Sequence, residues 1–166
     1  MSKQRERRAN LLAVIGFGTA FGFVEAAVVY YLRLLIKFHS IYQLSHYKVY
    51  LNLGFITFVS PRRPLLMNAR LGDVEVTREA ATILMLVFLS FVASTVWKRR
   101  LGAFMTSFAC WDIAYYVFLR ILDHWPSSLM TRDVYFLIPV TWIGPVITPL
   151  VICSVMLVVG SWLYLE

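Results

Sequence analysis

Residues 10–36 read NLLAVIGFGTAFGFVEAAVVYYLRLLI, an apolar run interrupted by the charges of Glu25 and Arg33. A helix needs roughly 20 such residues to cross a hydrocarbon layer about 30 Å thick, so this run is long enough. A secretory signal peptide has a shorter apolar region followed by a small-residue cleavage site, which is not found here. We therefore expect an uncleaved first transmembrane helix. It is preceded by four basic residues: Lys3, Arg5, Arg7 and Arg8.

The composition of the whole chain agrees with a membrane protein. Of its 166 residues 60% are hydrophobic and 15% are charged, and the mean hydropathy is +0.70. Soluble domains are less apolar and more charged, and disordered chains are much less hydrophobic, so both classes are excluded. The net charge of +7 lies in short basic blocks beside apolar runs, so we expect no nucleic-acid partner. Cys110 and Cys153 both lie inside apolar runs and predict no disulfide framework.

Three further runs are long enough to span, at residues 76–97, 101–122 and 145–165. Two shorter apolar runs, at residues 49–60 and 134–143, are about half a span and are typical of interfacial or re-entrant segments. The expected fold is one polytopic membrane domain over the whole chain. Its class is all-α, with four transmembrane helices and one or two half-span segments on the outer side.

Basic residues near the span ends predict the orientation. The N-terminal block and the triplet Lys98, Arg99 and Arg100 share one side of a four-helix protein, so both termini are expected in the cytoplasm, with the chain in the inner (cell) membrane. Residues 37–75 then form an outer loop and residues 123–144 an outer cap. Gly144-Pro145 favours a helix start after the cap. The alternative is one long, kinked fourth helix that begins at Val134.

Charged side chains inside spans are costly and usually face the interior of a helix bundle. Gly18-x-x-x-Gly22 is a small-residue packing motif, and Glu25 lies on the same stripe of its helix. Asp112 and Glu79 lie on corresponding stripes of the third and second spans. We expect an acidic pocket that opens outward and reaches the middle of the membrane. Its predicted cation, proton or metal ligands are Glu25, Asp112, Glu79, Asp123 and His124, and its predicted lining residues are Tyr115, Tyr116, Arg33 and Arg120.

Each of these residues also has a purely structural interpretation. Arg120 and Asp123 are spaced to neutralise each other on one helix. Arg33 can extend to the lipid headgroups, and Glu79 can complement a helix dipole. Glu25 and Asp112 can form structural hydrogen bonds with a tyrosine or an arginine.

Three functions fit the pattern. The first is a carrier or a metal-dependent site that binds a cation or a proton in the acidic pocket. A transition metal is one candidate cofactor, with His39 and His46 as further ligands. The second is an accessory or anchoring subunit of a larger membrane complex, or a homo-oligomer.

The third is an enzyme acting on lipid phosphates, with Asp112 or Asp123 as the base. Its phosphate ligands would come from Arg33, Arg62, Arg63, Arg120 and Arg132. The sequence identifies no catalytic residue, and the only partner it predicts directly is the lipid bilayer.

Overall fold

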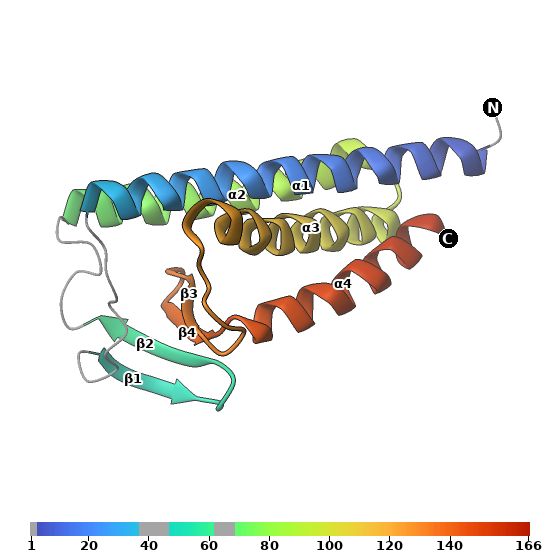
Figure 1. Ribbon diagram of the computed structural model, residues 1–166. Helices are drawn as coiled ribbons and strands as arrows, with labels where there is room; N and C mark the ends of the chain where they lie inside the picture. The colour runs from blue at the N-terminus through green and yellow to red at the C-terminus, as the bar shows by residue number, and fades with distance from the viewer. Residues whose placement is uncertain (1–2, 37–46, 62–68) are drawn as a thin grey trace.

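The computed structural model describes residues 3–36, 47–61 and 69–166. In these residues it has four long helices, α1 (Lys3–Ile36), α2 (Ala69–Ala93), α3 (Trp97–Asp123) and α4 (Ile147–Leu165) (Figure 1). All four are long and apolar enough to cross a membrane, so the four expected spans are confirmed as regards length and composition. The expected positions of His39, His46, Arg62 and Arg63 in the outer loop lie outside the described residues.

Two helices begin earlier than the apolar runs indicate. α1 starts at Lys3 and α2 at Ala69, because Lys, Arg, Gln and Glu are good helix formers and extend a helix beyond its apolar part. The sequence favours a tight turn at the basic triplet, between the second and third spans, and this expectation is wrong. Lys98 to Arg100 lie in the first turn of α3, and the connection is made by residues 94–96, where the Ser94 hydroxyl accepts a hydrogen bond from the Val96 amide.

The two half-span runs are not helical, so the all-α expectation is wrong for them. They form two antiparallel hairpins, β1 (Tyr47–Asn52) with β2 (Thr57–Pro61), and β3 (Arg132–Phe136) with β4 (Thr141–Pro145). The hairpins join into one sheet of order β1-β2-β4-β3, in which Val59 and Ile143 are almost fully buried. Short apolar runs cannot be assigned to helix or strand by periodicity, and β-branched and aromatic residues here favour strands.

The hairpin agrees with the expectation that a non-helical cap precedes the fourth helix, and the alternative of one long, kinked helix from Val134 is wrong. Pro139 lies between the two strands and Pro145 ends β4, so α4 begins at Ile147, slightly later than expected. Proline lacks an amide hydrogen, which suits it to a turn or a strand end better than to a helix interior.

Close glycine contacts hold α3 between α1 and α4, and Figure 1 shows α3 between those two helices. A Cβ atom at Gly22 of α1 would lie 2.5 Å from the carbonyl oxygen of Trp111, and one at Gly18 would lie 2.6 Å from that of Ser107. The expected Gly18-x-x-x-Gly22 packing face is therefore confirmed. On the other side of α3, a Cβ atom at Gly102 would lie 2.6 Å from the carbonyl oxygen of Gly160 in α4.

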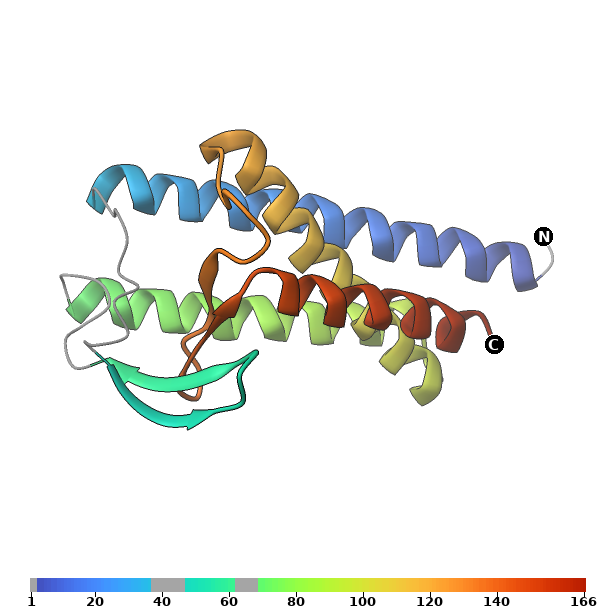
Figure 2. The ribbon, with the colours of Figure 1, turned by 60° about the horizontal axis from the view of Figure 1, so that its bottom comes forward.

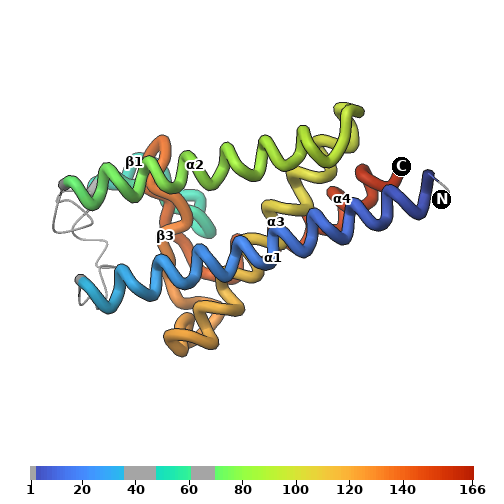
Figure 3. The backbone as a smooth tube through the Cα atoms, turned by 90° about the horizontal axis from the view of Figure 1, so that it is seen from above, coloured from blue at the N-terminus to red at the C-terminus, as the bar shows by residue number. Residues whose placement is uncertain are grey.

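The bundle has two different ends. The N-terminus, the C-terminus and the α2–α3 connection lie at one end, and the sheet lies towards the other (Figures 1 and 2). At the terminal end, Arg7 donates hydrogen bonds to the backbone carbonyl oxygens of Leu165 and Glu166, and Lys98 forms an exposed ion pair with Glu166. Seen from above, α1 and α2 run roughly parallel to each other (Figure 3).

We predict that Gly22→Ala destabilises the bundle because the new methyl group meets backbone atoms of α3 that cannot move independently. The expected loss in the free energy of unfolding is about 1–3 kcal/mol, as for other overpacked positions. Gly16→Ala is the matched control, since a Cβ atom there has nothing within 4 Å. Unfolding in a denaturing-detergent titration measures both. Equal stability of the two variants would contradict the close α1–α3 contact.

Candidate functional site

A cavity of about 270 Å³ lies between α3, α4 and the sheet. Phe104, Phe108 and Asp112 line it from α3 at four-residue intervals, which places them on one face of the helix. Thr148, Ile152, Cys153 and Met156 line it from α4. The two hairpins line part of the remaining side with the following residues: Ile56, Tyr135, Phe136 and Trp142.

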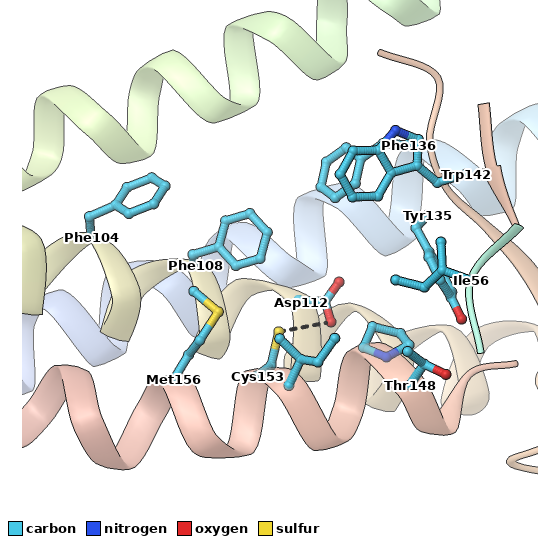
Figure 4. A pocket seen from close by; sticks show the side chains of 12 residues that line it. Ile56, Phe104, Phe108, Asp112, Tyr135, Phe136, Trp142, Thr148, Cys153 and Met156 are labelled. Carbon is cyan, nitrogen blue, oxygen red and sulfur yellow. Dashed lines mark hydrogen bonds between the residues drawn. The ribbon is translucent and has the colours of Figure 1, made fainter. Parts of the chain in front are cut away.

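Asp112 is the one carboxylate among the described residues that line this cavity. Figure 4 shows its carboxylate directed into the space between the aromatic rings and α4. The polar contact drawn there is weak: the Cys153 thiol donates a hydrogen bond to Oδ2 of Asp112 at 3.3 Å. Since a thiol is a poor donor, the carboxylate retains most of its capacity to interact with a ligand.

Aromatic rings form much of the cavity wall. The rings of Phe108 and Phe136 are stacked with centroids 6.2 Å apart, and Phe136 meets Trp142 edge-on at 6.1 Å. The Tyr135 hydroxyl donates a hydrogen bond of 2.7 Å to the carbonyl oxygen of Pro145, and burial raises the pKa of Tyr135 to about 12. The phenol is therefore neutral at physiological pH, and the wall adds no second negative charge beside Asp112.

Glu25 lies apart from this cavity in an ion pair between α1 and α2. Its Oε2 accepts a hydrogen bond of 2.5 Å from Nη1 of Arg78, whose Nη2 also binds Glu75 at 2.5 Å. The sequence analysis missed Arg78, although it lies inside the expected span 76–97 and directly before Glu79. An arginine at that position was a signal that one of the intramembrane carboxylates is paired.

Glu79 and Tyr116 attach the β3–β4 hairpin to the helices. The Glu79 carboxylate accepts a hydrogen bond of 2.8 Å from the backbone amide of Leu137, in the turn between the strands. The Tyr116 hydroxyl donates one of 2.9 Å to the buried Asp133 of β3. The ring of Tyr115 packs edge-on against that of Tyr116. These contacts give Glu79 and Tyr116 a positioning role for the sheet.

Arg33 and Asp123 form a second ion pair, at 2.5 Å, between the ends of α1 and α3. The guanidinium of Arg33 also lies 4.1 Å from the centre of the Trp125 ring. The expected neutralisation of Asp123 by Arg120 is therefore wrong, because Arg120 donates instead to the carbonyl oxygens of His124 and Pro126. His124 is exposed and ends α3 in the left-handed conformation.

The predicted ligands thus lie in separate local contacts. Within residues 3–36, 47–61 and 69–166, no three His, Cys, Asp or Glu side chains come together in a group that could hold a metal ion. Glu25 is paired with Arg78, Asp123 with Arg33, and Glu79 binds a backbone amide. Of the predicted carboxylates, Asp112 is the one that faces the cavity.

Comparison with known proteins adds no relative. No protein-family model matches the chain, and no curated protein or solved structure is significantly similar to it. The described helices are compatible, by their length and apolar composition, with a multi-pass membrane protein.

We predict that Arg78→Met lowers the free energy of unfolding by about 3 kcal/mol, because it leaves two carboxylates in an apolar setting without their cation. Lys98→Met is the control. It removes a cation from an exposed pair with Glu166, and such pairs contribute less than about 1 kcal/mol. Unfolding of the two variants in the same detergent gives the comparison, and similar losses for both would show that the Arg78 pair contributes no more than a surface contact.

Proposed function

We propose that this chain is a multi-pass membrane protein that binds a cation in the Asp112 cavity. The observation that carries the proposal is the pairing pattern: the neighbouring intramembrane carboxylates have basic or amide partners, whereas Asp112 faces an aromatic cavity with a thiol as its hydrogen-bond partner. A charged side chain in an apolar region is expensive, so a ligand that neutralises it there has a clear energetic reason to bind.

The lining favours a monovalent organic cation over a metal ion. Metal ions prefer several oxygen, nitrogen or sulfur ligands around one point, and one carboxylate with one thiol provides few of them. Aromatic faces attract organic ammonium groups through their quadrupoles, and a single carboxylate balances a single positive charge. A volume of about 270 Å³ suits a small ligand.

The density of basic residues, rather than their total number, supports the proposed orientation, because Lys37, Lys48, Arg62, Arg63 and Arg70 are spread over the expected long loop. The terminal end of the bundle carries the N-terminal block and the triplet that begins α3, and basic residues favour the cytoplasmic side. With the termini in the cytoplasm and the chain in the inner membrane, the sheet and the cavity lie in the outer half. The proposed site then opens outward, as expected from the sequence.

The other functions remain proposals with less support. An enzyme acting on lipid phosphates needs available arginines, and the guanidinium groups of Arg33 and Arg120 are already bound to Asp123 and to backbone carbonyls. An accessory subunit or a homo-oligomer would use the exposed apolar faces of the helices, including Leu84, Phe88 and Val92 of α2. Lipid covers such faces equally well, so co-purification of a stable partner in mild detergent is the test of that alternative.

Binding of tetrapropylammonium to the purified protein, measured by isothermal titration calorimetry, tests the proposed function. Asp112→Asn keeps the shape of the side chain and removes its charge, so we expect at least tenfold weaker binding, which equals about 1.4 kcal/mol. Asp73→Asn is the matched control, since Asp73 is an exposed carboxylate of α2 that does not line the cavity. Its affinity should equal that of the unmodified chain.

A second variant separates binding from folding. Phe108→Leu keeps an apolar side chain in the wall and removes one aromatic face, so binding should weaken by about 0.5–2 kcal/mol. A folded Asp112→Asn protein that binds tetrapropylammonium like the unmodified chain would overturn the proposal. So would the absence of binding to the unmodified chain itself.

A further inference from the structure

The β1–β2 hairpin carries apolar side chains that neither the sheet core nor the cavity uses. Val49, Tyr50, Leu51, Leu53 and Phe55 are each between 47% and 57% exposed. A hairpin end that faces water normally carries Gly, Asn, Asp or Ser, because such a turn is solvated. Here Gly54, which has a φ of +84° at the turn, is flanked by Leu53 and Phe55. A solvated turn does not account for this composition.

Three hydrogen bonds within the hairpin end pair several of its polar groups. The Asn52 side-chain oxygen accepts hydrogen bonds from the Gly54 amide at 2.9 Å and from the Thr57 hydroxyl at 3.2 Å. The Leu53 amide donates to the carbonyl oxygen of Ile56 at 2.9 Å. In water these groups would have solvent as an alternative partner, whereas an apolar medium requires them to be paired within the protein.

Contact with α4 sets the depth of the hairpin end. The Thr148 hydroxyl, in the first turn of α4, donates a hydrogen bond of 3.2 Å to the carbonyl oxygen of Phe55. The 19 residues of α4 span about 28 Å, which is close to the hydrocarbon thickness of about 30 Å. A span of this length places the first turn of α4 at the boundary of the hydrocarbon layer. The hairpin end lies beside that turn (Figures 1 and 2).

The other end of the hairpin has the side chains expected nearer the headgroups. Lys48 precedes Leu53 by five residues, or about 16 Å of extended strand, and its ammonium lies 5.9 Å from the centre of the Tyr50 ring. Lysine and tyrosine are favoured at membrane interfaces. Near the hairpin, α4 also carries the exposed apolar residues Ile147 and Val151.

We propose that the β1–β2 hairpin inserts its end into the lipid leaflet opposite the termini, with Leu53 and Phe55 in the outer part of the hydrocarbon and Lys48 at the headgroups. The occupant of this apolar surface is lipid. The hairpin thereby becomes a second attachment of the sheet to the membrane, beside the start of α4. This inference does not depend on what the Asp112 cavity binds.

Spin-label accessibility in phosphatidylcholine–phosphatidylglycerol vesicles tests the proposal on the full chain. Labels at Leu53→Cys and Phe55→Cys report the hairpin end, and the unmodified chain, whose Cys110 and Cys153 are buried, gives the labelling background. Ser127→Cys in an exposed loop is the water reference, and Val158→Cys on the exposed face of α4 is the lipid reference. We expect oxygen collisions at both hairpin labels close to those of the lipid reference, and collisions with a nickel chelate several-fold below those of the water reference.

Two results would overturn the proposal. Nickel collisions at both hairpin labels equal to those at Ser127→Cys would place the hairpin end in water. Low collisions with both oxygen and nickel would mean that protein covers this surface, and dipolar broadening between labels would identify a second copy of the chain as the cover.

Discussion

The contacts of α3 with α1 and α4 are the constraint on which the other features depend. In lipid the hydrophobic effect does not drive helices together, so close packing and polar contacts must do so. Gly18 and Gly22 bring the backbone of α1 against α3 on one side, and Gly102 and Gly160 bring α4 against it on the other. α3 therefore has a fixed position, and it presents Asp112 and Tyr116 towards the sheet.

The sequence predicted the features that depend on the spacing of residues along the chain. Run length identified four spans, glycine spacing identified the α1 packing face, and position within a span placed Asp112 near the middle of α3. It could not predict which partner a carboxylate meets on another helix, because that depends on helix rotation and separation. Glu25 with Arg78 and Asp123 with Arg33 are such pairs, 53 and 90 residues apart along the chain.

The sheet was missed for a different reason. Residues 49–60 and 134–143 are too short to span, and their apolar character fits either an interfacial helix or a strand. Their pairing is non-local: Phe58 of β2 faces Trp142 of β4, and Val59 faces Thr141. Neither hairpin alone shows that a neighbour more than 80 residues away will complete its sheet. The aromatic wall of the cavity was missed with it, since Tyr135, Phe136 and Trp142 all belong to the sheet.

The cavity itself follows from where α3 and α4 touch. These helices run antiparallel and approach closely at Gly102 and Gly160, near the terminal end. About 15 Å further along α3, at Asp112, no glycine holds the helices together, and Phe104 and Phe108 lie on the facing surface. Figure 1 shows α4 moving away from α3 in that direction, and the sheet lies beyond the start of α4. A contact between two glycines near one end thus leaves space towards the other. That space holds Asp112, whose hydrogen-bond partner within residues 3–36, 47–61 and 69–166 is the Cys153 thiol rather than a basic side chain.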